Sequence, residues 1–99
     1  MEMIHLLLQE YQIKMSVGIY PWPAQIIYDT EDSKIVNLMS NFCKNKCEFF
    51  FNNFPDFFRD LNNSNKKDII LKYYINGDVH FNSLGNEKLF VNFINNFKN

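Results

Sequence analysis

The sequence predicts a small α/β domain with a small parallel sheet and about three main helices. Two short apolar runs, residues 15–20 and 47–52, have the length and composition of buried strands. A segment with apolar residues at helical spacing lies between them, which is the order expected of a parallel strand–helix–strand unit. The length of 99 residues is enough for one domain, and we treat residues 1–99 as a single partial domain.

In the first half of the chain, apolar side chains at helical spacing predict a helix over residues 3–13. The strand at 15–20 ends before a Pro-Trp-Pro segment, because proline cannot donate a hydrogen bond to a sheet ladder. A second helix is predicted over residues 33–46, with Asp32 or Ser33 as its cap. Its expected apolar face consists of Ile35, Met39, Phe42 and Cys43.

In the second half, a polar connector follows the second strand, with a short helix expected around residues 55–61 and an exposed turn at 62–67. Residues 69–75 fit either a helix end or a strand. Residues 76–83 are predicted to form a loop, and the last helix covers about residues 84–97. The side chains expected to face inwards from it are Phe90, Phe93, Ile94 and Phe97.

The composition excludes several classes of function. Hydrophobic residues make up 46% of the chain, which indicates a folded protein rather than a disordered one. Ten basic and eleven acidic residues are scattered, so there is no basic stripe to bind nucleic acid. Asp56, Arg59 and Asp60 are expected on a solvated helix face. No segment approaches a membrane span and no signal peptide is apparent, so the chain as given is expected in the cytoplasm.

The two cysteines, Cys43 and Cys47, are expected to be buried free thiols, because one falls on the apolar stripe of a predicted helix and the other opens a strand. A structural zinc site needs four ligands of suitable spacing, and His5 and His80 do not form a spaced pair. We therefore expect no metal, no cofactor and no disulfide framework.

The segment most informative about chemistry is GDVHFNSLGN, residues 77–86. It places Asp78 and His80 two apart in a loop, just before a helix that Asn82 can cap and that Gly85 follows into. A Ser–His–Asp hydrolase needs such a pair: the histidine takes the proton of the serine, and the carboxylate holds the imidazole tautomer. A short loop ahead of a rigid helix is a suitable way to hold both side chains.

This segment resembles the last conserved block of SGNH-type (GDSL-like) serine hydrolases, in which an Asp and a His precede an Asn, a Gly and a helix. The resemblance implies that Asp78 is the acid and His80 the base. The stretches VGIYPWPAQI (17–26) and CEFFFNNFPDFF (47–58) are similar to earlier strands and loops of the family. The resemblance therefore implies part of a flavodoxin-like three-layer sandwich acting on an ester-type small molecule or carbohydrate.

The parts of such an enzyme that carry the nucleophile are not found in the sequence. The family has a Gly-Asp-Ser block after its first strand, and a Gly and an Asn that complete the oxyanion hole. None of the serines lies beside Gly-Asp on a strand-to-helix turn: Ser16, Ser33, Ser40, Ser64 and Ser83. The chain is thus expected to be the C-terminal part of an esterase, inactive alone and completed by an N-terminal half. A self-contained hydrolase using Ser83 is a third option.

Several alternatives stay open. Asn76 and Gly77 could form a two-residue hairpin turn, which would make His80 an ordinary strand residue. Trp22 could line a substrate cleft or could cap the core. The strand at 15–20 would lack a neighbour on one side, and an open edge can dock a partner chain. The alternative function is therefore a non-catalytic remnant or a small interaction module.

Overall fold

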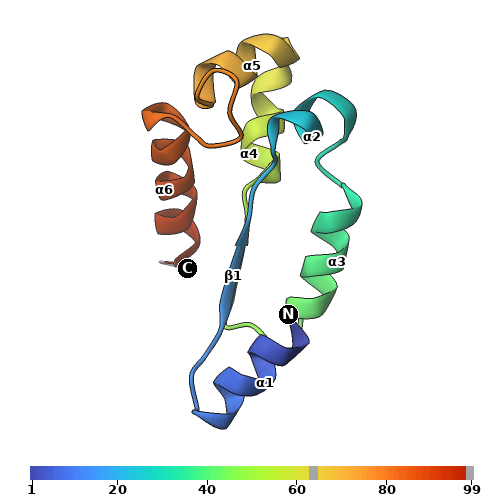
Figure 1. Cartoon of the computed structure of the whole chain (residues 1–99), viewed down its shortest axis with the longest axis vertical. Coiled ribbons are helices and arrows are strands. Elements are labelled where there is room, and N and C mark those ends of the chain that lie inside the picture. The colour runs from blue at the N-terminus through green and yellow to red at the C-terminus, as the bar shows by residue number, and fades with distance from the viewer. Residues whose placement is uncertain (63–64, 98–99) are drawn as a thin grey trace.

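The computed structural model of the chain describes residues 1–62 and 65–97 and has an α/β architecture that is mostly helical (Figure 1). Ser64 and part of the turn predicted at 62–67 lie outside the described residues. The elements, apart from the strands, are α1 (Glu2–Glu10), α2 (Pro23–Tyr28), α3 (Lys34–Cys43), α4 (Phe54–Arg59), the 3-10 helix η1 (Asp60–Asn62), α5 (Lys66–Tyr73) and α6 (Ser83–Phe97). The three main predicted helices correspond to α1, α3 and α6, while α2 was not expected.

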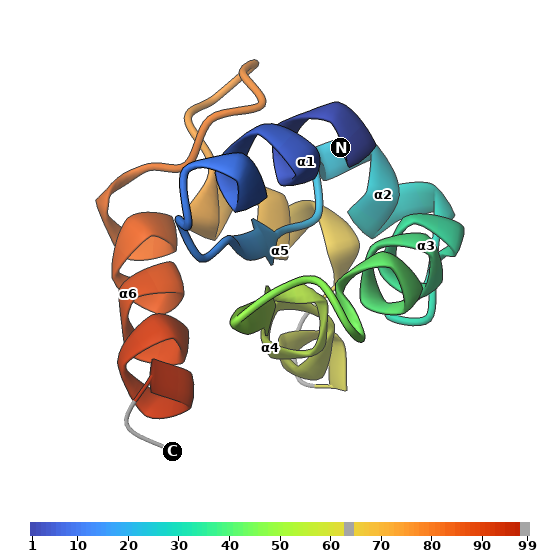
Figure 2. The ribbon, with the colours of Figure 1, turned by 90° about the horizontal axis from the view of Figure 1, so that it is seen from below.

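The two predicted strands are confirmed as β1 (Ser16–Ile19) and β2 (Phe49–Asn52), which pair in parallel with Val17 opposite Phe50. The connection between them runs through α2 and α3. Helix α3 contacts β2 from one side and α6 contacts it from the other, and Figure 2 shows these helices on either side of the strands. Within the described part of the chain, β1 pairs with β2 alone, so its other edge is open.

The main core lies beyond the carboxyl ends of the strands rather than on a broad sheet face. A two-stranded sheet offers little area to cover, and α2, α4 and α5 instead pack against one another and the start of α6. Phe57 and Ile26 are fully buried there, beside Ile69, Tyr73 and Tyr74. This core supports the loop that contains the candidate catalytic residues.

The inward face predicted for α6 is only partly correct. Phe93 packs on Phe51 and Phe97 packs on Phe49, with ring centroids 4.9 and 5.3 Å apart. Yet Phe90 is 61% exposed, and Phe93 and Phe97 also remain largely open to solvent. The reason is the narrow sheet, which presents only one column of side chains of β2 to this helix. Apolar periodicity shows which face is apolar, but not whether anything covers it.

Helix α3 begins as predicted, with the Ser33 hydroxyl accepting the Val36 amide at 3.4 Å. Val36, rather than the expected Ile35, is buried. The prediction of free thiols is wrong, because Cys43 and Cys47 form a disulfide. Their spacing of four residues, in a chain that turns once more after α3, brings the two Cα atoms to 4.7 Å.

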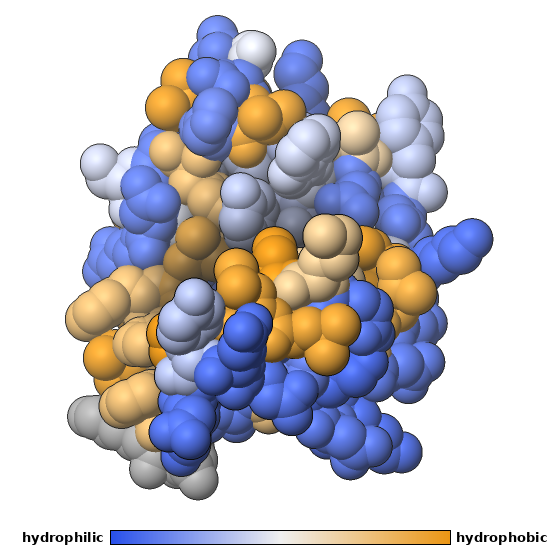
Figure 3. All heavy atoms as spheres, turned by 60° about the horizontal axis from the view of Figure 1, so that its bottom comes forward, coloured by the Kyte–Doolittle hydropathy of each residue, from blue (hydrophilic) through white to orange (hydrophobic). Residues whose placement is uncertain are grey.

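Helix α1 rests lightly on the rest of the molecule and has no buried residue. A Glu2–Lys46 ion pair and an edge contact between His5 and Phe42 hold it beside the end of α3. Its apolar side chains gather on the face shown in Figure 3 and are mostly exposed: Met3, Ile4, Leu6 and Leu7. None of the helices in residues 1–62 and 65–97 is long and apolar enough to span a membrane.

Candidate functional site

The loop between α5 and α6 is closed by hydrogen bonds at its base. The Ile75 amide donates to the His80 carbonyl at 2.9 Å, and Tyr74 and Phe81 form an isolated antiparallel bridge. At the tip, the Asp78 amide donates to the Ile75 carbonyl at 2.9 Å, closing a turn in which Gly77 has a φ of 76°. The expected Asn-Gly turn is therefore present, but it leads into a longer loop rather than a two-residue hairpin.

The structure brings the two predicted catalytic residues into direct contact. Asp78 Oδ1 lies 2.8 Å from His80 Nδ1 and also accepts the backbone amides of Val79 and His80, at 2.6 and 3.3 Å. The His80 ring and the Val79 amide, as hydrogen-bond donors, hold the pKa of the Asp78 carboxyl below its ordinary value. The carboxylate thus stays ionised at neutral pH beside the imidazole.

This contact determines what the imidazole can do. A carboxylate accepting from Nδ1 keeps the proton on that nitrogen and leaves Nε2 with a free lone pair. No hydrogen bond to Nε2 is found among the described residues, and the His80 side chain is 74% exposed. The pair therefore presents a base to solvent in the tautomer that a serine nucleophile needs.

Asn82 and Gly85 lie at the start of α6 and join it to the end of α5. The Asn82 side chain accepts the Gly85 amide at 3.0 Å, as an N-cap does, and donates to the Lys72 carbonyl at 2.8 Å. A Cβ built on Gly85 would lie 2.3 Å from the Tyr73 carbonyl oxygen and 2.6 Å from a ring carbon of Phe81. Only glycine permits this close approach, which anchors the loop on both sides of His80.

Trp22 does not cap the core, because it is 54% exposed. It lines a hollow of about 450 Å³ beyond the carboxyl end of β1, together with Ile19, Tyr20, Gln25, Ile35 and Phe54. The Tyr20 ring also lies 4.9 Å, centroid to centroid, from the ring of Phe81. Trp22 and the Asp78–His80 pair are therefore linked through Tyr20 and Phe81.

The described serines do not complete the pair, since none of their hydroxyls hydrogen-bonds to His80. Ser83 begins α6, as expected from the sequence. Ser33 is buried as the cap of α3, Ser16 begins β1 and Ser40 lies within α3. Ser64 lies outside the described residues.

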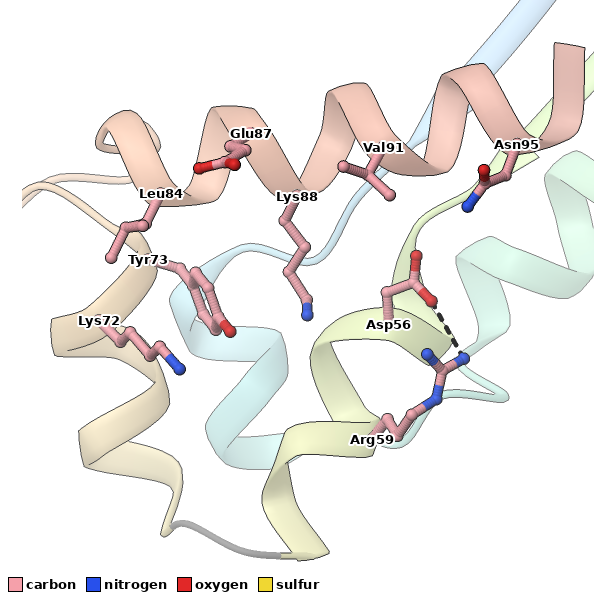
Figure 4. A pocket seen from close by; sticks show the side chains of 9 residues that line it. All are labelled: Asp56, Arg59, Lys72, Tyr73, Leu84, Glu87, Lys88, Val91 and Asn95. Atoms are coloured by element: carbon pink, nitrogen blue, oxygen red, sulfur yellow. Dashed lines mark ion pairs between the residues drawn. The ribbon is translucent and has the colours of Figure 1, made fainter.

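A second cluster of polar groups lies between α4, α5 and α6, around a hollow of about 410 Å³ (Figure 4). Asp56 accepts from the Asn92 amide at 2.6 Å and pairs with Arg59 at 3.1 Å. Asp60 accepts the Tyr73 hydroxyl and lies 3.3 Å from Lys88 Nζ. The expectation of a simple solvated face is therefore wrong for the two aspartates, which connect α4 and η1 to the later helices.

The electrostatics of this cluster favour a structural role. Partial burial and the hydrogen bond to Asp60 raise the pKa of Tyr73 to about 12. Partial burial opposes ionisation of Asp60, but the Tyr73 hydroxyl and Lys88 outweigh it and lower the pKa of that carboxyl. Sequence reasoning missed these pairs because their partners lie 28 and 36 residues apart. No local pattern predicts contacts at such a separation.

Comparison of this chain with family models, with curated proteins and with solved structures gave no match. The functional argument therefore rests on the Asp78–His80 pair and on the residues that support its loop.

Proposed function

We propose that this chain is the C-terminal part of an SGNH-type acyl hydrolase and supplies the base, His80, and the acid, Asp78, of a Ser–His–Asp triad. The observation that supports it most directly is the 2.8 Å contact between Asp78 Oδ1 and His80 Nδ1. It gives the histidine the tautomer and the partner that acyl transfer requires. Two exposed residues in a surface loop have no structural need for that arrangement.

The setting of the pair supports the same proposal. The resemblance to the family block extends beyond Asp78 and His80 to an Asn and a Gly, and both have a definite role here at the start of α6. The two parallel strands, with helices on both sides, suit the last two strands of a flavodoxin-like three-layer sandwich. The open edge of β1 is where the preceding strand of such a sheet would pair.

In the proposed reaction, a serine hydroxyl attacks the carbonyl carbon of an ester while His80 Nε2 takes its proton. Asp78 stabilises the imidazolium that forms. The tetrahedral intermediate then collapses, the imidazolium gives its proton to the departing alkoxide, and an acyl-serine remains. Water, deprotonated by the same nitrogen, releases the acid and restores the serine.

The serine and the oxyanion donors are proposed to come from a segment outside these 99 residues. None of the described serines bonds to His80, and oxyanion stabilisation is commonly the largest single contribution to such catalysis. The completing segment should therefore contain an apolar strand that pairs in parallel with β1 and a Gly-Asp-Ser turn. The substrate class is an ester of a small molecule or a carbohydrate.

The coding sequence that precedes Met1 is the first test. We expect it to encode a strand followed by Gly-Asp-Ser in the same frame or in an adjacent one. An intact upstream region without such a block, combined with the absence of a separate chain that carries one, would contradict the proposal.

The second test measures activity in the protein that carries both blocks. A fluorophosphonate probe should label its serine, and His80→Ala should lower the hydrolysis of p-nitrophenyl acetate by roughly 10²–10⁴-fold. Asp78→Asn should lower it as well, because the amide no longer favours the required tautomer. His5→Ala is the matched control, since His5 lies on α1 against Phe42. Equal loss of activity in the His5 and His80 variants would rule out a triad role.

A second candidate function is an interaction module that uses the open edge of β1. It is favoured by the exposed apolar side chains of α1 and by the unpaired strand edge among the described residues. A chain of this kind should self-associate or bind a partner through the edge. Light scattering that shows a stable monomer at all concentrations would count against self-association through that edge.

A further inference from the structure

The hollow beyond the carboxyl end of β1 has no role in the proton transfers described above. It is formed where β1 gives way to α2, and Tyr20 and Trp22 contribute aromatic rings to it. In open α/β sheets, ligands bind beyond the carboxyl ends of the strands. Its volume of about 450 Å³ is in the range of small-molecule sites.

The backbone around Trp22 is held firmly. Pro21 is fully buried, and its carbonyl accepts the hydroxyl of Tyr74. The Trp22 amide donates to Gln25 Oε1 at 2.9 Å, and the Trp22 carbonyl accepts the amides of Gln25 and Ile26 at 2.9 and 3.1 Å. A large apolar ring is thus presented to solvent from a fixed support, at little entropic cost when a ligand binds.

The chemistry of the hollow selects the ligand. Trp22 and Tyr20 are 54% and 42% exposed, so a ligand lying on their rings would be covered on one face only. A long acyl chain would keep half of its surface in water. A pyranose ring has an apolar C–H face, which suits the negative face of an aromatic ring, and an outer face rich in hydroxyls. The Tyr20 hydroxyl and the Gln25 amide nitrogen, unbonded within the described residues, can reach ring hydroxyls.

We infer that Tyr20 and Trp22 form a binding site for a pyranose ring, which rests on the proposed function in that it makes the substrate a carbohydrate ester. Tyr20 connects the two sites, because its ring lies 4.9 Å from that of Phe81, the residue after His80. A sugar stacked on Trp22 would thus lie beside the loop that presents the imidazole.

Trp22 is the only tryptophan of the chain, so its fluorescence reports binding without any need for catalysis. We would titrate the full chain with methyl β-D-glucopyranoside and with N-acetylglucosamine. We expect a saturable change in emission with a millimolar Kd, together with protection from acrylamide quenching. The absence of a saturable change with both sugars, or saturation by octanoate in their place, would overturn the inference.

Saturation-transfer NMR on variants locates the site. Trp22→Ala should weaken sugar binding at least tenfold, whereas Tyr28→Ala should not change it, because Tyr28 is 87% exposed but does not line the hollow. Equal binding by both variants would overturn the inference, and the titration of the unaltered chain stands if Trp22→Ala fails to fold. Sugar binding without triad activity would retire the proposed reaction alone, and triad activity without sugar binding would retire this site alone.

Discussion

Replacing Gly85 with alanine should destabilise the chain, although alanine normally favours helices by about 1 kcal/mol over glycine. The added methyl would lie 2.3 Å from the Tyr73 carbonyl oxygen and 2.9 Å from Phe81 Cβ, where ordinary contacts begin at 3.4 Å. Backbone cannot rotate away as a flexible side chain can. The start of α6 must therefore move by roughly 1 Å, as in other overpacked sites.

The cost follows from the bonds that this movement disturbs. The Asn82 amide donates to the same Tyr73 carbonyl at 3.0 Å, and the Asn82 side chain caps Gly85 at 3.0 Å. Overpacking costs about 1–3 kcal/mol and a weakened cap about 1 kcal/mol, against the gain of about 1 kcal/mol in helix propensity. We expect a net loss of about 2 kcal/mol, which lowers the melting temperature of a chain of this size by roughly 10 °C.

Thermal and urea unfolding followed by circular dichroism measures this loss. Gly18→Ala is the matched control, since its added Cβ would lie 3.8 Å from Phe51 Cβ, an ordinary contact. That variant should unfold at the temperature of the parent chain or slightly above it, because glycine weakens a strand. If Gly85→Ala proved as stable as Gly18→Ala, the close approach at the start of α6 would not exist and the reasoning would fail.

Three further predictions concern the same framework. Asn82→Ala should cost about 1–2 kcal/mol in urea unfolding, because the cap of α6 is lost; Asn82→Asp, which keeps the acceptor, should cost less. The pKa of Tyr73 is raised to about 12, so its contribution to stability should be complete below pH 10 and lost as the pH rises towards 12. Asp60→Asn should move the ultraviolet titration of Tyr73 to lower pH, and an unchanged titration would exclude their coupling. The pKa of Asp60 is lowered, so its own contribution should persist above pH 3.8 and fade as the pH falls through the folded value. Changing Cys43 and Cys47 together to serine should cost about 2 kcal/mol through the short closed loop, and unfolding insensitive to reductant would contradict the bond.

Local features of this protein were available from the sequence alone. The two strands, the cap Ser33 and the turn at Asn76 and Gly77 depend on residues within a few positions of one another. The same holds for the contact of Asp78 with His80, since residues two apart in a tight loop need no distant partner to meet. Such short-range geometry follows from backbone sterics and side-chain hydrogen bonding.

The tertiary structure decided everything that depends on what lies across from a residue. It placed Asp56 and Asp60 against later helices, left the aromatic face of α6 partly uncovered and turned Trp22 outwards. It also showed why position 85 must be glycine, through a carbonyl twelve residues earlier in the chain. Periodicity in a sequence determines which side of an element is apolar. Whether that side is covered depends on contacts between distant segments, which only the packed chain contains.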